Sequence, residues 1–139
     1  GLGAHSTIDA HDGNTVEKIL ELTKGTGTKY VIDTSGSSKA CATAPDLVEI
    51  GGKIALVGWP NKSSFEYPIE KIIEKEIDIV GINRYANTFP TAIAMVASGQ
   101  LDLSPIISHR FTFKEVCNAF SFASNNKTSV LKVVINNDE

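Results

Sequence analysis

Arg84 and Tyr85 are the residues whose types and position best suit contact with a small molecule. They follow an apolar, β-branched run at residues 77–80, which predicts a strand that ends at Gly81. In open α/β sheets, ligands bind outside the carboxyl ends of the strands. The alternative is that Arg84 is a solvated loop charge and Tyr85 an aromatic residue at the edge of the core. The residues alone leave both interpretations open.

Two further turns follow predicted strands in the same way. The polar pair Thr34 and Ser35 comes directly after the strand predicted at residues 29–33. Trp59 and the preceding Gly58 come after the strand predicted at residues 53–57. An indole at this position could stack on a flat ligand, or it could pack at the edge of the core.

The familiar nucleotide-binding and catalytic motifs do not occur in these 139 residues. The glycines of residues 1–4 do not form a dinucleotide fingerprint, because no strand precedes them and Thr7 occupies the place of the third glycine. There is no Walker loop, no Gly-x-Ser-x-Gly elbow and no His-Glu-x-x-His sequence. We interpret His5 and His11 as exposed or capping residues, and His109 as a structural histidine within a strand.

Both cysteines, Cys41 and Cys117, lie in helical patterns, and free buried thiols are the expected state. A disulfide between them, or a metal site that also uses a histidine, remains open. No ligand spacing supports a metal site.

Length and composition favour one globular domain that can bury about two thirds of its unfolded surface. Hydrophobic residues make up 42% and charged residues 21% of the chain, which argues against disorder. The formal net charge is -3 and no Lys/Arg cluster occurs, so we expect neither nucleic acid nor an anionic membrane as a partner. With no apolar run of membrane-spanning length and no visible signal peptide, we expect a cytoplasmic protein.

The chain alternates between strand and helix patterns. Strands are predicted at residues 6–9, 29–33, 53–57, 77–80, 106–111 and 130–135, with helices between most of them. The run at residues 54–57 shows no polar alternation, which is typical of a parallel strand covered on both faces. Strands separated by helices predict an α/β fold with right-handed crossovers in a parallel sheet.

Several segments resemble, in order, the zinc-containing medium-chain dehydrogenases. The match is strongest to the polyol branch, which includes sorbitol and xylitol dehydrogenases. It is carried by VIDTSG at residues 31–36, GGKIALVG at 51–58, GINRYANTFP at 81–90, ISHRF at 107–111 and KVVI at 132–135. Each segment is modest, but the ordered set is specific and covers essentially the whole chain.

The resemblance implies a partial Rossmann-type parallel sheet, with strands three to six of the family's cofactor domain and helices on both faces. Residues 1–100 correspond to this partial NAD-binding domain. Residues 101–139 correspond to a strand–helix–strand segment that returns to the catalytic domain. The chain is then a fragment, because the family's phosphate turn and zinc ligands belong to segments outside it.

The resemblance also implies a cofactor, NAD, with NADP not excluded, and a zinc ion that polarises the alcohol oxygen in the full-length enzyme. The residues expected to line the nicotinamide are Thr34, Ser35, Val57, Gly58, Trp59, Ile82 and Asn83. Arg84 and Tyr85 are expected to approach the polyol, to which a guanidinium can donate several fixed hydrogen bonds. The resemblance assigns no catalytic or metal-binding residue to this chain.

The expected function is thus a share in oxidising a secondary alcohol to a ketone by hydride transfer, with the isolated chain inactive. The alternative is a non-catalytic α/β dimerisation module or nucleotide-binding module. The family's dimers pair the sixth strand with its twofold mate, so we expect a homo-oligomer, at least a dimer, through residues 77–82, from Ile77 to Ile82. Because an open apolar edge invites pairing, we also expect residues 6–9, or alternatively another chain, to pair beside residues 29–33.

Overall fold

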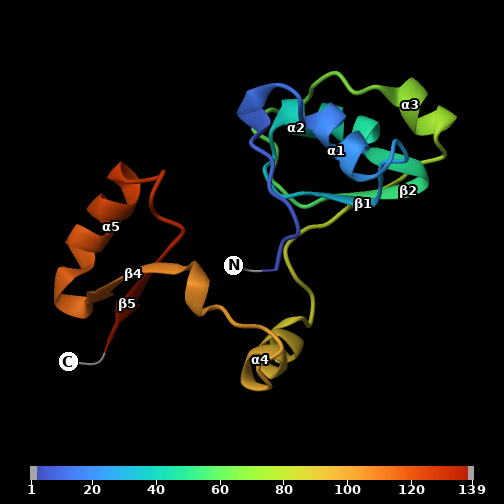
Figure 1. Ribbon diagram of the computed structural model, residues 1–139. Coiled ribbons are helices and arrows are strands. Elements are labelled where there is room, and N and C mark those ends of the chain that lie inside the picture. The colour runs from blue at the N-terminus through green and yellow to red at the C-terminus, as the bar shows by residue number, and fades with distance from the viewer. Residues whose placement is uncertain (1–2, 138–139) are drawn as a thin grey trace. The chain divides into compact units, whose positions relative to one another are not determined.

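The computed structural model describes residues 3–137, which form two compact units (Figure 1). One unit is Ser6–Ala86. The other comprises residues 87–137 together with residues 3–5. The expected boundary at residue 100 concerns the domains of the resembling family and stays a prediction.

The first unit is built on a parallel sheet of three strands in the order β1-β2-β3. The strands are β1 (Thr28–Asp33), β2 (Val48–Leu56) and β3 (Asp78–Gly81). Val31 pairs with Ile54, and Ile54 pairs in turn with Ile79. The predicted α/β fold with parallel strands is therefore confirmed.

The helices of this unit lie over one face of the sheet (Figure 1). They are α1 (Thr15–Leu22), α2 (Ser38–Leu47) and α3 (Ile69–Glu74). Because the strand order advances in one direction, right-handed crossovers place the connecting helices on the same side. Within this unit the helices cover one face.

A small core lies between this face and the helices. Its buried members are Ala44, Val48, Ile54 and Ile77, with Val31, Leu56 and Ile72 packed against them. Ile54 and Leu56 lie two positions apart on β2 and so point to the same face. The helical side of the sheet is therefore where burial stabilises this unit.

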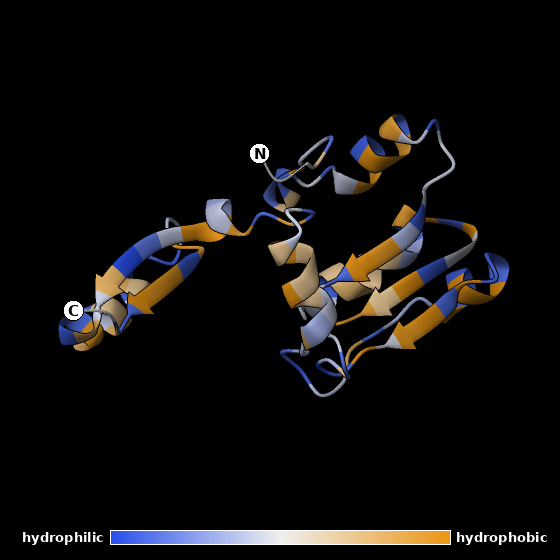
Figure 2. Ribbon diagram, turned by 90° about the horizontal axis from the view of Figure 1, so that it is seen from below, coloured by the Kyte–Doolittle hydropathy of each residue, from blue (hydrophilic) through white to orange (hydrophobic). Residues whose placement is uncertain are grey.

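The strands of this sheet are largely hydrophobic (Figure 2), and side chains on the face opposite the helices are exposed. Tyr30 is 63% exposed and Ile32 66%, while Val57 and Val80 are about 40% exposed. The prediction that residues 54–57 are covered on both faces is therefore wrong for this unit. The apolar run is real, but the side on which crossover helices lie leaves half of it open.

Residues 6–9 do not form the predicted strand, and β1 pairs only with β2 among the described residues. The side chain of Asp9 instead accepts a hydrogen bond of 2.9 Å from the backbone N–H of His11. It thereby caps the 3-10 helix Ala10–Asp12. Such local side-chain hydrogen bonds compete with sheet pairing, and the predicted pairing with residues 29–33 is wrong.

The second unit contains the predicted strand–helix–strand segment. Its elements are α4 (Phe89–Ala97), β4 (Ile107–Thr112), α5 (Val116–Asn125) and β5 (Lys132–Asn136), with 3-10 helices at Ser104–Ile106 and Phe113–Glu115. β4 and β5 pair in parallel. Thr112 and Glu115 form a capping box at the start of the segment's helical part. The half-buried His109 ring lies 4.6 Å from that of Phe122, as expected of a structural histidine, but its buried Nδ1 has no hydrogen-bond partner among the described residues.

α4 has Pro90 in its first turn, and Gly99 lies two residues beyond its end. Its apolar residues Ile93 and Val96 are 65% and 42% exposed. The helical period is a local signal of the sequence, whereas the surface that would cover the apolar side is not.

The cysteines are both free; Cys41 is buried and Cys117 is exposed, so only the first fits the expected buried thiol.

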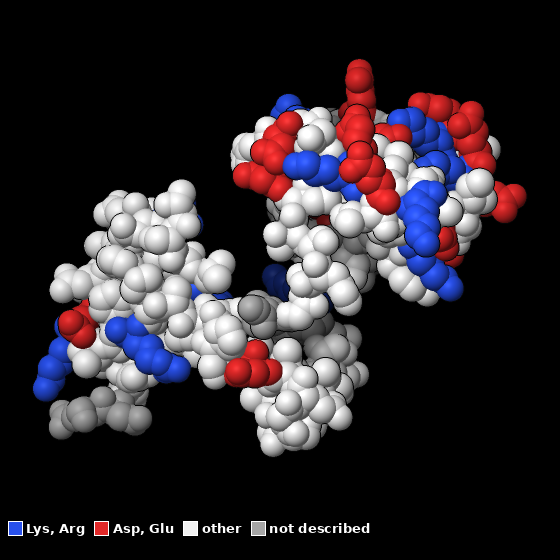
Figure 3. All heavy atoms as spheres, in the orientation of Figure 1, with Lys and Arg blue, Asp and Glu red and all other residues white. Residues whose placement is uncertain are grey.

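On the helical side of the first unit, acidic and basic side chains alternate without a patch of one sign (Figure 3). None of the helices in residues 3–137 is long and apolar enough to cross a membrane.

Candidate functional site

The candidate site is the edge of the sheet where β1, β2 and β3 end. Because the three strands are parallel, their carboxyl ends meet at the same edge. The loops that leave this edge carry all the residues predicted from the sequence: Thr34 and Ser35 after β1, Val57, Gly58 and Trp59 after β2, and Ile82, Asn83, Arg84 and Tyr85 after β3.

The first two loops are in direct backbone contact at Gly36 and Gly58. A Cβ placed at Gly36 would lie 1.9 Å from the carbonyl oxygen of Trp59, and one at Gly58 would lie 2.2 Å from the backbone nitrogen of Gly36. Gly36 also has a φ of +64°, which side-chain-bearing residues rarely adopt. Glycine is therefore required at both positions for the loops to approach this closely.

The main chain of Asp33 joins the same two loops. Its carbonyl oxygen accepts hydrogen bonds of 2.9 Å from the backbone N–H groups of both Val57 and Gly58. Asn61 adds a further link, since its N–H donates to the carbonyl oxygen of Gly36. Its side-chain oxygen accepts a 2.9 Å hydrogen bond from the hydroxyl of Ser38 at the start of α2.

The side chain of Asp33 is buried beneath the first loop. One carboxylate oxygen accepts from the hydroxyl of Ser35 at 2.6 Å and from its backbone N–H at 3.2 Å. The other accepts from the N–H of Gly36 at 3.2 Å and from the thiol of Cys41 at 3.3 Å. The loop is thus wrapped around a carboxylate that has four donors.

These contacts set the ionisation of both side chains. Burial by itself raises the pKa of Asp33, but the hydrogen bonds from Ser35, Cys41 and Gly36 together outweigh it and hold the pKa below its ordinary value. Burial, and then the hydrogen bond to Asp33, raise the pKa of the Cys41 thiol. At neutral pH the pair is therefore a carboxylate that accepts from a protonated thiol.

The third loop leaves β3 beside the second. The N–H of Ile82 donates to the carbonyl oxygen of Leu56 at 2.9 Å, so the chain after β3 stays alongside the end of β2. Arg84 has a φ of +57°, in the left-handed region that few non-glycine residues adopt. Such backbone conformations are enriched at ligand-binding sites. Tyr85 is 66% exposed.

The structure narrows the choices that the sequence left open. Trp59 is 85% exposed, which excludes the interpretation that its indole packs at the edge of the core. Arg84 and Tyr85 are exposed too, so Tyr85 is not a buried core-edge aromatic. The hydroxyl of Ser35 is engaged with Asp33, whereas Thr34 is exposed at the same turn.

The sequence analysis did not identify the residues that support the first loop from within the unit. They are Asp33, Gly36 and Cys41. A usable signal was present at Asp33, since an acidic residue ends an otherwise apolar strand directly before a Thr-Ser-Gly turn. An acidic residue at a buried strand end must find hydrogen-bond donors nearby. The partner Cys41 could not have been recognised, because its approach depends on how α2 packs on the sheet.

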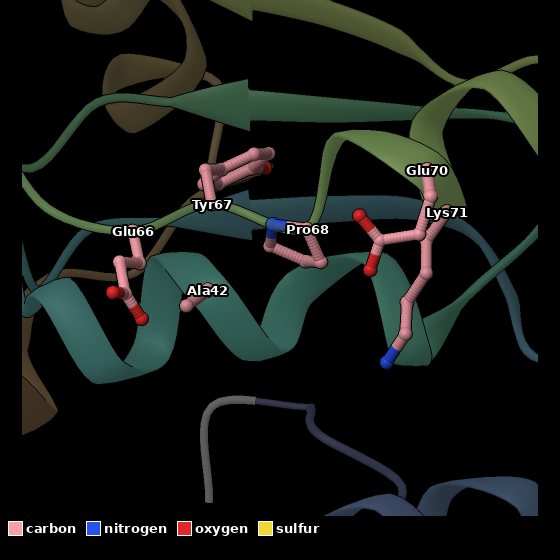
Figure 4. Close-up of a pocket in the computed structure, with 6 residues that line it drawn as sticks. All are labelled: Ala42, Glu66, Tyr67, Pro68, Glu70 and Lys71. Carbon is pink, nitrogen blue, oxygen red and sulfur yellow. The ribbon is translucent and has the colours of Figure 1, made fainter.

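A hollow of about 620 Å³ lies elsewhere, between α2 and the segment that leads into α3 (Figure 4). It is lined by Ala42, Glu66, Tyr67, Pro68, Glu70 and Lys71. The ammonium group of Lys71 hydrogen-bonds to Asp46. None of the predicted site residues lines this hollow, and its charged lining residues are Glu66, Glu70 and Lys71.

Residues 3–137 contain no group of three or more His, Cys, Asp or Glu side chains that could hold a metal ion. The described residues therefore do not fit a zinc site, and no chemical step is assigned to zinc here. The carboxyl edge does fit one end of a flat, hydrogen-bonding ligand. It combines an exposed indole, an exposed hydroxyl and loops whose main chain is fixed by hydrogen bonds.

Comparison with known proteins shows the family to which the chain is similar. The family model described as "Zinc-binding dehydrogenase" matches residues 1–98. A sorbitol dehydrogenase of Bacillus subtilis is 32% identical over 134 residues, which cover 96% of this chain and 38% of that protein. An L-idonate 5-dehydrogenase of Vitis vinifera is 37% identical over 119 residues, covering 84% of this chain and 32% of that protein.

Among solved structures, an oxidoreductase of unknown specificity from Escherichia coli matches with a TM-score of 0.85 and 31% identity, covering 98% of this chain and 39% of that one. The chain therefore belongs to the zinc-binding dehydrogenase family, and its relatives include polyol dehydrogenases. It spans less than two fifths of the length of these relatives.

Proposed function

We propose that this chain forms the nicotinamide end of the cofactor site in an NAD-dependent, zinc-type polyol dehydrogenase. The full-length enzyme oxidises a secondary alcohol to a ketone by transferring hydride to the nicotinamide. NADP is the alternative cofactor. The observation that supports the proposal most is that all the predicted contact residues follow three parallel strands at one edge of a sheet.

In this proposal the protein binds and orients, while the cofactor supplies the hydride chemistry. Main-chain groups of Val57 and Gly58, whose positions Asp33 fixes, border the nicotinamide. Thr34 offers an exposed hydroxyl and Trp59 an exposed indole that excludes water from one side of the ring. The remaining contacts come from Ser35, Ile82 and Asn83.

Arg84 and Tyr85 serve the polyol in the same proposal. Both are exposed and directly follow the loop that borders the cofactor. A guanidinium presents five N–H donors in a rigid arrangement, which suits several hydroxyl groups of one substrate. The left-handed backbone at Arg84 turns the chain at this point and so helps to fix where that side chain departs.

We also propose that the protein forms at least a dimer through residues 77–82 and works in the cytoplasm. β3 is the outer strand of its sheet, and all four of its residues are exposed. An open strand edge of this kind presents unpaired N–H and C=O groups to a second copy. Light scattering tests the mass, and slow amide exchange in β3 at high concentration tests the location.

The proposal is tested by assaying the full-length protein that carries this chain with sorbitol, xylitol and L-idonate. NADH formation that requires both a polyol and zinc is expected. The 139-residue chain alone should give no turnover and bind NAD weakly at best. A full-length protein that shows no NAD-dependent oxidation, but self-associates through β3, would favour the alternative of a non-catalytic dimerisation module.

A further inference from the structure

We propose that Asp33 and Cys41 act as a positioning pair, in which a buried carboxylate and a thiol fix the turn at residues 34–36 for cofactor binding. The inference rests on the proposed function for the identity of the ligand. It adds two residues that do not themselves touch that ligand. The comparisons point to neither.

The turn at residues 34–36 is held by one buried side chain, that of Asp33. Asp33 is 7% exposed, and both its carboxylate oxygens accept from the turn: one from Ser35, the other from Gly36. The hydroxyl of Ser35 links the carboxylate to the start of α2, because it also accepts a hydrogen bond from the N–H of Ser37 at 3.1 Å. Displacing the carboxylate would therefore shift the turn and the first residues of the following helix together.

Cys41 holds the carboxylate of Asp33 in place through a hydrogen bond from α2. It lies in α2, is 4% exposed and donates its thiol hydrogen to the oxygen that also binds Gly36. A residue so buried cannot contact a ligand at the sheet edge. Cys41 can therefore affect cofactor binding only indirectly, and its hydrogen bond to Asp33 is the proposed route.

The turn at residues 34–36 also contacts the loop that follows β2. Gly36 lies against the backbone of Trp59, and the carbonyl oxygen of Asp33 binds the N–H groups of the two residues after β2. The N–H groups of Ser35 and Gly36 point to the carboxylate, so they are not offered to a ligand. Asp33 and Cys41 thus determine which groups of the turn stay exposed to a ligand, and Thr34 is one of them.

The chemistry requires a charged acceptor with donors around it. Replacing the carboxylate with an amide would set an NH₂ group against N–H, O–H or S–H donors, and one hydrogen bond at least would be lost. Replacing the thiol with a methyl group would remove a single donor, whereas a hydroxyl in its place can still donate. Asp33→Asn, Cys41→Ala and Cys41→Ser therefore form a graded series.

The experiment measures the dissociation constant for NAD and the turnover of the full-length protein. We expect Asp33→Asn to weaken NAD binding about tenfold or more, since a hydrogen bond to a charged group is lost. Cys41→Ala should weaken binding about threefold, and Cys41→Ser should return it to within about twofold of the parent. Turnover at saturating NAD should change less than affinity. The matched control is Asp12→Asn, an exposed aspartate of the 3-10 helix Ala10–Asp12 in the same unit, which should leave both quantities unchanged.

The inference is overturned if the parent binds NAD and both Asp33→Asn and Cys41→Ala bind it equally well. It is also overturned if Cys41→Ser binds no better than Cys41→Ala, because a mere packing role would not distinguish them in this way. If Asp33→Asn does not fold, the two Cys41 variants decide the question.

If the parent binds no NAD, the proposed function fails, and amide exchange in the 139-residue chain decides the positioning role separately. The N–H groups of Ser35 and Gly36 should then exchange faster in Cys41→Ala than in the parent, and at the parent's rate in Cys41→Ser. Equal rates in all three chains would overturn the positioning role as well.

Discussion

Gly36 and Gly58 bring the loops after β1 and β2 so close together that neither position has room for a side chain. A Cβ at Gly58 would lie 2.2 Å from the backbone nitrogen of Gly36 and 2.7 Å from the carbonyl carbon of Thr34. The atoms in the way belong to backbone that is itself held by hydrogen bonds from Val57, Gly58 and Asn61. The candidate site therefore depends on two glycines that cannot relax by moving a flexible side chain.

Gly58→Ala should destabilise the chain by about 1–3 kcal/mol, because the added methyl group forces the two loops apart. Gly81→Ala is the matched control, since a Cβ there would meet no atom within 4 Å. It should change the free energy of unfolding by no more than about 0.5 kcal/mol. Urea denaturation measures both, and equal midpoints for the two variants would contradict the close contact of the loops.

Stability should fall in acid through Asp33. Its hydrogen bonds hold the pKa in the folded chain below the ordinary value of 3.8, although burial opposes them. A carboxyl group with a lowered folded pKa contributes stability that is fully present above about pH 5 and is lost as the pH falls through the folded pKa. The difference in free energy of unfolding between the parent and Asp33→Asn should therefore be largest at neutral pH and shrink below about pH 4. A difference that stays constant from neutral to acid pH would contradict this prediction.

The two thiols should react at very different rates. Burial, followed by the hydrogen bond to Asp33, raises the pKa of Cys41, and the side chain is enclosed, whereas Cys117 is exposed. A maleimide should label Cys117 at least about tenfold faster than Cys41 at pH 7.5. Mass spectrometry of the Cys117→Ser variant isolates the slow site, which should open only in denaturant. Rapid labelling of that variant without denaturant would show that α2 does not enclose Cys41.

Lys75 closes the end of α2. Its ammonium group donates to the carbonyl oxygens of Pro45 at 2.8 Å and Val48 at 2.9 Å, where the helix gives way to β2. Lys75→Met should lower the free energy of unfolding by about 1–3 kcal/mol, because partly buried acceptors lose a charged donor. Lys39→Met, an exposed change on the same helix, should have little effect. If thermal melting finds both variants equally stable, Lys75 does not serve as this cap.

The sequence allowed the strand and helix order to be predicted, because apolar runs such as residues 54–57 and the helix start at Pro90 are local signals. It also placed Arg84 and Trp59 after strand ends, since the carboxyl edge of a parallel sheet follows from strand order. Burial could not be predicted in the same way. Ile93 and Ile32 are apolar in the expected period, yet whether another surface covers them depends on parts of the fold that a single helix or strand does not encode.

Two further features depended on competition between interactions. Residues 6–9 have a strand-like pattern, but Asp9 stabilises a local turn through its side chain and so prevents pairing. The anchor of the candidate site, Asp33 with Cys41, joins residues eight positions apart on different elements. The hydrogen-bond donors around Asp33 can be identified only once the packing of α2 on the sheet is known.

Arg84→Ala in the full-length protein tests most directly the proposal that this chain holds the nicotinamide and substrate end of a polyol dehydrogenase. The measurement is NADH formation from a polyol at saturating NAD, with the dissociation constant for NAD determined in parallel. The matched control is Arg110→Ala, an exposed arginine in β4. The account predicts that Arg84→Ala lowers kcat/KM for the polyol about 100-fold or more, as expected when a donor to the reacting substrate is removed. NAD affinity should change by less than about threefold, within the effect of a single lost hydrogen bond, and Arg110→Ala should behave as the parent. Equal polyol turnover in Arg84→Ala and the parent would contradict it.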